Sequence, residues 1–175
     1  MKWSQIESDD WVHIPFDENE RAVKGSALVS WGMNLEDVPN ECFDICIRYD
    51  SKGKQFSAYS EERVQLSDIV GSSYDMYSDI PWIVAYQKIK RASTYILQGD
   101  TTIGKYKWQL KKPCIEQWNK IELTRTNNGL YIDGNGNHRV IIYKMMMFSE
   151  LSSKRYTELS AICKQYWLKA MVRNE

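Results

Sequence analysis

The chain has 175 residues, with 23 basic and 23 acidic side chains. This length suits one domain, or one domain with an appendage. A hydrophobic share of 43% excludes a disordered chain, and a net charge of zero argues against a sequence-blind nucleic-acid binder. Residues 1–100 carry 17 acidic and 10 basic side chains, whereas residues 101–175 carry 13 basic and 6 acidic. One interpretation is that the two oppositely charged halves pack together in one globule. The other is that the basic C-terminal half faces an anion such as a phosphate group or a nucleic-acid backbone.

The cysteines and histidines do not follow the spacing of a zinc site, because the chain has no Cys-x-x-C pair and only His13 and His138. We expect Cys42 and Cys46 on one strand, where positions four apart lie about 13 Å apart and cannot form a disulfide. Reduced thiols are typical of a cytoplasmic protein. No apolar run reaches the length of a signal peptide or a membrane span, so we expect no membrane partner.

Residues 1–40 form an acidic segment in which only residues 11–16 suggest a short extended piece. A core is predicted over residues 41–150. Within it, alternation predicts a hairpin over residues 42–59, and a short helix is expected over residues 61–70. Asp79 is predicted to cap a further helix.

The second half of the core gives the clearest signals. Alternation from residue 119, the turn Asn127-Asn128-Gly129 and the return to Ile132 predict a hairpin. A buried helix follows over residues 140–148. Residues 151–175 are expected to form a C-terminal helix that packs on the core through one apolar face, whose residues are Tyr156, Leu159, Cys163, Tyr166 or Trp167, and Ala170. Strands that precede helices indicate an α+β fold.

One segment has the composition of a ligand-binding turn. Residues 130–140 run from a strand through Gly134 and Gly136 into a helix. Glycines at such a junction permit positive φ and a close approach of the backbone to a ligand. The first turn of the helix offers N–H groups and the positive end of its dipole, which attract anions.

Three side chains add hydrogen-bond donors to this turn: Asn137, His138 and Arg139. Arg139 can bind a phosphate through two parallel hydrogen bonds. Asp133 is a candidate to orient Arg139 or His138, or to hold a magnesium ion. The alternative is a purely structural turn, in which Asp133 caps the helix and Arg139 forms a salt bridge.

The stretch Tyr131-Ile-Asp-Gly-Asn-Gly-Asn-His-Arg-Val140 resembles the signature of the ParB/sulfiredoxin-like superfamily, in which a hairpin leads through an Asp-Gly-x-His-Arg turn into a helix. Residues 118–123 are similar to the strand before that hairpin, and residues 62–71 to a short helix of the family. The resemblance implies a small mixed sheet with flanking helices. It also implies that the phosphates of ATP, ADP or CTP bind to Gly134, Gly136, Asn137, His138 and Arg139.

The chain departs from this family at two points. Sulfiredoxins carry a catalytic cysteine directly before the histidine, whereas Asn137 stands there in this chain. We therefore do not expect sulfinic acid reduction. The turn from Asp133 to Arg139 is also two residues longer than the family form, so either Asp133 or Gly136 matches the family position, but not both.

Three functions from different classes follow as hypotheses. The first is a nucleotide-binding domain that acts as a phosphotransferase, NTPase or nuclease of a plasmid, phage or defence-related system. Its catalytic candidates are Asp133, His138 and Glu20, and its candidate cofactor is Mg²⁺. The second is a DNA-binding regulator that uses a basic and aromatic set, Lys105, Lys107, Trp108, Lys111 and Lys112. The third is an inactive protein-interaction module. A solvated loop around Glu20 and a solvent-facing charged strand over residues 105–112 are the corresponding structural alternatives.

Overall fold

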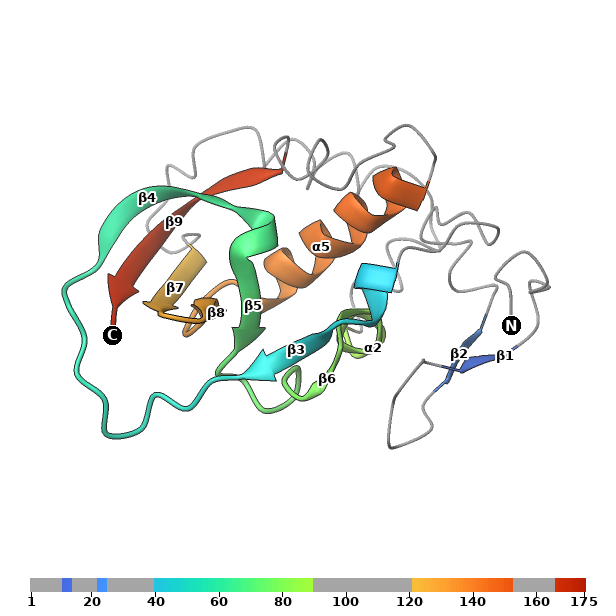
Figure 1. Ribbon diagram of the computed structural model, residues 1–175, viewed down its shortest axis with the longest axis horizontal. Helices are drawn as coiled ribbons and strands as arrows, with labels where there is room; N and C mark the ends of the chain where they lie inside the picture. Colours follow the sequence, from blue (N-terminus) through green and yellow to red (C-terminus); the bar gives the residue numbers. More distant parts are fainter. Residues whose placement is uncertain (1–10, 14–21, 25–39, 90–120, 153–165) are drawn as a thin grey trace.

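The computed structural model describes residues 11–13, 22–24, 40–89, 121–152 and 166–175 (Figure 1). Within these ranges the chain forms two sheets. A small antiparallel sheet joins β1 (Trp11–His13) to β2 (Ala22–Lys24), which agrees with the extended piece expected near residue 11. A sheet of seven strands, accompanied by two α-helices, forms an α+β arrangement.

The seven-stranded sheet is mixed. Its strands are β3 (Ile45–Arg48), β4 (Ser60–Gln65), β5 (Ile69–Ser72), β6 (Ile80–Pro81), β7 (Ile121–Thr126), β8 (Gly129–Ile132) and β9 (Trp167–Asn174). Their order across the sheet is β4-β9-β7-β8-β5-β3-β6. The pairs β9–β7, β8–β5 and β5–β3 are parallel, and the other three pairs are antiparallel.

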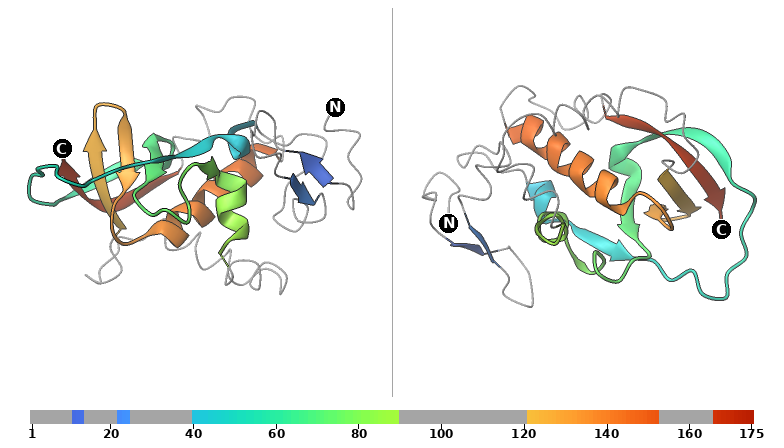
Figure 2. Two further views of the ribbon diagram at one scale, coloured as in Figure 1. Left: turned by 90° about the horizontal axis from the view of Figure 1, so that it is seen from below. Right: turned by 180° about the vertical axis from the view of Figure 1, so that it is seen from behind.

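Two α-helices and two short 3-10 helices accompany the larger sheet. They are α2 (Trp82–Gln87), α5 (Asn137–Ser152), η2 (Asn40–Phe43) and η3 (Leu66–Asp68). Both α-helices lie on the same face of the sheet (Figure 2). The core lies between them and the sheet, where Ile83 and Ile141 meet Leu123, Ile132 and Val172 at zero exposure. No helix in the described ranges is long and apolar enough to span a membrane.

The predicted hairpin and the helix after it are confirmed. Strands β7 and β8 pair antiparallel and turn between Thr126 and Gly129, whose φ of +135° favours glycine. The helix expected over residues 140–148 is α5, which begins three residues earlier. Helix α2 also forms, but Pro81 occupies the capping position and Asp79 does not.

The hairpin predicted over residues 42–59 is wrong. Strand β3 pairs with β5 and β6, and residues 55–59 form no strand. On β3 the core-facing residue is Cys46, which is fully buried, while Ile45 and Ile47 are 43% and 47% exposed. Alternation identifies a strand, but it specifies neither which strand it pairs with nor which face the helices cover.

Two predicted helices are replaced by strands. Residues 61–70, expected as a helix, form the end of β4, η3 and the start of β5. The C-terminal helix expected over residues 151–175 is contradicted over Trp167–Asn174, which is β9, while residues 153–165 lie outside the described ranges. In β9, Leu168, Ala170 and Val172 are buried at every second position, which is strand periodicity. Neighbours on both sides, β4 and β7, also supply backbone hydrogen bonds that a helix would forgo.

The sheet face opposite the helices carries a polar and aromatic row. Tyr131, Thr124 and Arg173 are in register on β8, β7 and β9. The alternation of strand side chains places them on the other side from Ile132, Leu123 and Val172.

Candidate functional site

The turn between β8 and α5 is shaped by two glycines with left-handed backbone conformations. Gly134 has a φ of +129° and Gly136 a φ of +118°. A Cβ at Gly134 would collide with the Glu122 carboxylate, and one at Gly136 would lie 3.0 Å from the Ile121 side chain. Any other residue would therefore push the turn away from β7.

Hydrogen bonds fix the same turn to the start of β7. The Glu122 backbone N–H donates to the carbonyl oxygen of Asn135 at 2.9 Å, and the Asn135 N–H donates to Glu122 Oε2 at 3.0 Å. The Asp133 N–H donates to the Glu122 carbonyl oxygen at 3.1 Å. The residues before α5 are thus held by strand β7, which presents the helix N-terminus in one position.

The first turn of α5 is anchored to β5. Ser72, which is fully buried, donates its hydroxyl to Asn137 Oδ1 at 2.6 Å, and Asn137 Nδ2 donates to the Gly134 carbonyl oxygen at 3.3 Å. The N–H of Val140 bonds to the Gly136 carbonyl oxygen at 3.0 Å, so the positive end of the helix dipole lies at the glycine turn.

An aromatic series leads from this turn to the surface. The Tyr77 hydroxyl lies 2.6 Å from His138 Nε2, and the two rings meet edge to face with centroids 5.6 Å apart. Tyr74 stacks on Tyr77 at 5.7 Å and is 53% exposed. Next to it, Met76 is 50% exposed, and its carbonyl oxygen accepts a hydrogen bond of 3.1 Å from Lys88 Nζ. Sequence reasoning missed these residues, because no spacing pattern links residues 74–88 to the glycine turn.

These two groups of residues enclose one pocket of about 790 Å³. Its lining residues are Tyr74, Met76, Tyr77, Lys88, Gly134, Asn135, Gly136, Asn137, His138 and Arg139. The set contains two cationic side chains, one histidine and no carboxylate. The five residues predicted to contact phosphate, namely Gly134, Gly136, Asn137, His138 and Arg139, are therefore brought together in one basic hollow.

Asp133, the sixth residue predicted for this site, does not line the pocket. Its Oδ2 accepts hydrogen bonds from Arg173 Nη2 at 2.6 Å and from Thr124 Oγ1 at 2.9 Å. Burial alone raises the pKa of Asp133, but hydrogen bonds from Arg173, Ser73 and Thr124 outweigh it and hold the pKa below its ordinary value. The expectation that Asp133 orients Arg139 or His138 is thus corrected, since its carboxylate binds Arg173 on the sheet face opposite the helices.

Arg173 is itself held in place by aromatic rings. Its guanidinium lies 3.8 Å from the centroid of Phe56 and 5.1 Å from that of Tyr59. Its Nε donates to Thr124 Oγ1 at 3.1 Å. The side chain is 22% exposed and that of Asp133 is 10% exposed, so this is a mostly buried ion pair that secures the end of β8 to β9.

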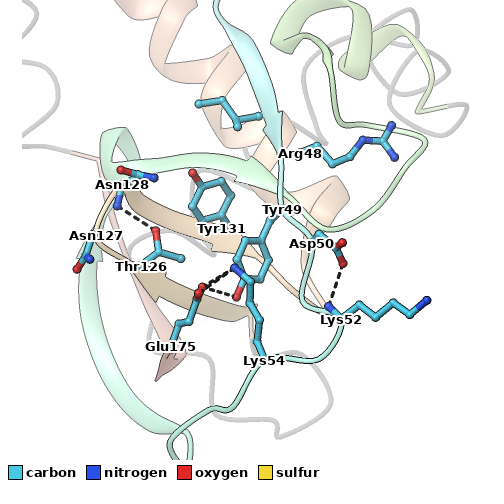
Figure 3. Close-up of a pocket in the computed structure, with 11 residues that line it drawn as sticks. Arg48, Tyr49, Asp50, Lys52, Lys54, Thr126, Asn127, Asn128, Tyr131 and Glu175 are labelled. Atoms are coloured by element: carbon cyan, nitrogen blue, oxygen red, sulfur yellow. Dashed lines mark hydrogen bonds and ion pairs between the residues drawn. The ribbon is translucent and has the colours of Figure 1, made fainter.

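A second pocket, of about 520 Å³, lies between the segment after β3 and the β7–β8 turn (Figure 3). Tyr49 stacks on Tyr131 with centroids 4.9 Å apart, and its hydroxyl donates to Glu175 Oε2 at 2.9 Å. Burial and the neighbouring Glu175 raise the pKa of Tyr49. Lys54 binds Glu175 as well, at 2.8 Å. The lining of this pocket therefore contains both cationic and carboxylate side chains.

The remaining predicted residues lie outside the described ranges. They are Glu20 of the acidic run and the nucleic-acid candidates Lys105, Lys107, Trp108, Lys111 and Lys112. For metals, the described ranges contain no group of three His, Cys, Asp or Glu side chains that could hold an ion.

Comparison of the chain with protein-family models, with curated proteins and with solved structures gave no match. The function is therefore inferred from the pocket at the glycine turn and from the chemistry of its lining residues. A glycine turn, a helix N-terminus and basic side chains converge there. Such an arrangement can bind an anion through backbone N–H groups and charged side chains together.

Proposed function

We propose that the pocket at the glycine turn binds the phosphate groups of a nucleotide such as ATP, ADP or CTP. The observation that carries this proposal is that the described residues lining the pocket include Lys88, His138 and Arg139 beside the glycine turn at the N-terminus of α5. A phosphate chain placed there would meet the positive end of the helix and a guanidinium that can bind two of its oxygens.

The resemblance to the ParB/sulfiredoxin-like superfamily supports the same proposal. That family places a hairpin, a glycine turn and a helix in this order, and β7, β8, the turn at residues 133–136 and α5 follow it here. The family's phosphate-binding positions correspond to residues 136–139, all of which line the pocket. We propose membership of this superfamily on the strength of that segment.

We propose nucleotide binding as the primary function, and phosphoryl transfer, NTP hydrolysis or nucleic-acid cleavage as the reactions it would serve. Each of these reactions acts on a phosphorus centre, and each requires a base or a metal ion in addition to phosphate binding. The Asp133 carboxylate accepts a hydrogen bond from Arg173, so Asp133 is not proposed as the base or as a metal ligand. Within the pocket, His138 is the side chain with the chemistry of a general base or acid.

The proposal is tested by thermal unfolding with ATP, ADP, CTP and GTP, each with and without Mg²⁺. A nucleotide at about 100 times its Kd adds about 2.7 kcal/mol to the free energy of unfolding, which raises the Tm by about 5–10 °C. We expect this shift in the wild-type protein and its loss in Arg139→Ala.

Arg125→Ala is the matched control. Arg125 lies at the far end of the β7–β8 hairpin, where it forms an ion pair of 2.6 Å with Glu62. Its loss removes an arginine from the surface without touching the pocket, so the nucleotide shift should persist. If no nucleotide raises the Tm of the wild-type protein, or if Arg139→Ala retains the full shift, the proposed phosphate site is wrong.

A further inference from the structure

One wall of the pocket, formed by Tyr74 and Met76, is apolar and exposed. Of the five large hydrophobic side chains with high exposure in the described part of the chain, two lie here, Tyr74 at 53% and Met76 at 50%. Burying a large aromatic surface is favourable, so such surfaces beside a pocket indicate a ligand or partner. Phosphate binding gives no reason for the exposed Tyr74 ring and Met76 side chain, because phosphate oxygens make no favourable contact with an aromatic ring face or a methionine side chain.

The orientation of Tyr74 leaves one ring face available to a ligand. One face stacks on Tyr77 with an interplanar angle of 28°, and the residue remains 53% exposed, which leaves ring surface accessible to a ligand. Tyr77 is in turn held by His138 through the 2.6 Å contact between the hydroxyl and Nε2. Tyr74 is therefore a supported ring, connected through two successive ring contacts to the helix N-terminus.

We infer that Tyr74 and Met76 form the binding surface for the base of the nucleotide, so that the pocket takes a nucleotide as a whole and not free phosphate. This inference rests on the phosphate site proposed above. The ring centroid of Tyr77 lies 5.6 Å from that of His138 and 5.7 Å from that of Tyr74. The distance between His138 and Tyr74 is therefore at most the sum of these two, which an extended nucleoside triphosphate can span. Aromatic stacking accepts every base, because each base has a π face.

The composition of this wall also predicts which bases bind with higher affinity. Lys88 is its charged side chain, and the Lys88 ammonium already donates to the Met76 carbonyl oxygen. Recognition then depends on the stacked area more than on hydrogen bonds to base edges. A purine offers a larger ring system than a pyrimidine, so ATP and GTP should bind with similar affinity and both should bind more tightly than CTP and UTP.

The test measures the Kd of ATP, GTP, CTP, UTP and inorganic tripolyphosphate by calorimetry for wild-type protein, Tyr74→Ala, Tyr74→Phe and Ile45→Ala. Tyr74→Ala should weaken ATP and GTP by about 5- to 100-fold, the cost of losing one stacking contact. The same variant should leave the Kd of tripolyphosphate unchanged. Tyr74→Phe keeps the ring and should bind like the wild type. Ile45→Ala, which removes an exposed apolar side chain on β3, controls for general surface effects.

Two results would overturn the inference, and they are distinguishable. If tripolyphosphate binds as tightly as ATP and Tyr74→Ala changes neither Kd, the phosphate site stands and the base surface is wrong. If neither tripolyphosphate nor any nucleotide binds the wild-type protein, the proposed function fails and the base surface fails with it. The Tm of each unliganded variant shows that the fold is intact, as expected for substitution of a side chain that is half exposed.

Discussion

The hydroxyl of Tyr77 and the Nε2 atom of His138 lie 2.6 Å apart, which joins the segment before α2 to the first turn of α5. Burial, and to a lesser degree the neighbouring Tyr74, raise the pKa of Tyr77, so its hydroxyl keeps its proton at neutral pH. The two residues are 61 positions apart in the chain, and their contact closes one side of the pocket.

Tyr77→Phe tests the energetic value of this contact. The variant keeps the ring and removes only the hydroxyl, so the free energy of unfolding should fall by about 1 kcal/mol, the net value of one hydrogen bond. Chemical denaturation measures the change. Tyr74→Phe is the control, since its side chain is half exposed, and it should change the free energy of unfolding by less. Equal effects in the two variants would show that the Tyr77–His138 contact contributes nothing.

Gly136→Ala tests the geometry of the turn. The new Cβ would meet Ile121 at 3.0 Å with φ at +118°, so we expect a loss of about 1–3 kcal/mol in the free energy of unfolding, measured by denaturation. Gly53→Ala is the matched control, because Gly53 also has positive φ but has nothing within 4 Å of an added Cβ. Its loss should be smaller, about 1 kcal/mol. An equal loss at both positions would exclude the proposed contact with Ile121.

Arg173→Ala tests the ion pair that holds Asp133. The substitution leaves a mostly buried carboxylate without its main partner, and such a loss costs about 2–4 kcal/mol. Arg125→Ala breaks the more exposed pair with Glu62 and should cost less than about 1 kcal/mol. Denaturation at pH 7 compares the two. A loss at Arg173 no greater than that at Arg125 would contradict this role.

The pH dependence of the same variant provides a separate prediction. In the wild type the folded-state pKa of Asp133 is lowered, so its contribution to stability is present above the ordinary aspartate pKa and is lost as pH falls through the lowered value. In Arg173→Ala, burial acts against fewer hydrogen bonds, so we expect the pKa of Asp133 to rise and protonation in acid to relieve the unpaired charge. The difference in free energy of unfolding between wild type and variant should therefore shrink from pH 7 to pH 3. A constant difference across this range would show that Asp133 is not responsible.

Cys46 should resist alkylation in the folded protein. Burial raises the pKa of its thiol to about 12, so the reactive thiolate is scarce at pH 8, and Cys46 is fully buried. Burial also raises the pKa of Cys42, and both thiols are free. The expectation that the two cysteines share one strand is wrong, since Cys42 lies in η2 and only Cys46 lies in β3. Labelling with iodoacetamide, read by peptide mass spectrometry, should modify Cys46 in denaturant and spare it in buffer. Equal rates in both conditions would contradict this burial.

The sequence was most informative where one local rule decided the structure. Asn127-Asn128-Gly129 between two alternating runs predicted the β7–β8 hairpin, because a turn that favours glycine joins neighbouring strands. The glycine turn before α5 was predicted for the same reason. The residues of the site that were predicted, 134 and 136–139, all belong to this continuous segment.

Sequence reasoning failed where the pairing of strands far apart in the chain determined the structure. Trp167–Asn174 has a stripe of apolar residues that also fits a helix, and only its position between β4 and β7 makes it a strand. Tyr74, Met76, Tyr77 and Lys88 reach the pocket because β5 lies beside β8, a parallel pairing that no local pattern encodes. The direction of Asp133 likewise depends on Arg173, which is 40 residues away.

The position of β9 has a consequence for synthesis of the protein. Strand β4 pairs only with β9 in the larger sheet, and Ser60 is opposite Val172, 112 residues later. A nascent chain that has reached Ser152 already contains β4, β7 and the whole glycine turn. It does not yet contain β9, which lies between β4 and β7 in the folded sheet. Both strand edges then stay unpaired, and such edges attract other chains. Arg173 is also still missing, so Asp133 lacks this ion-pair partner until β9 has been synthesised.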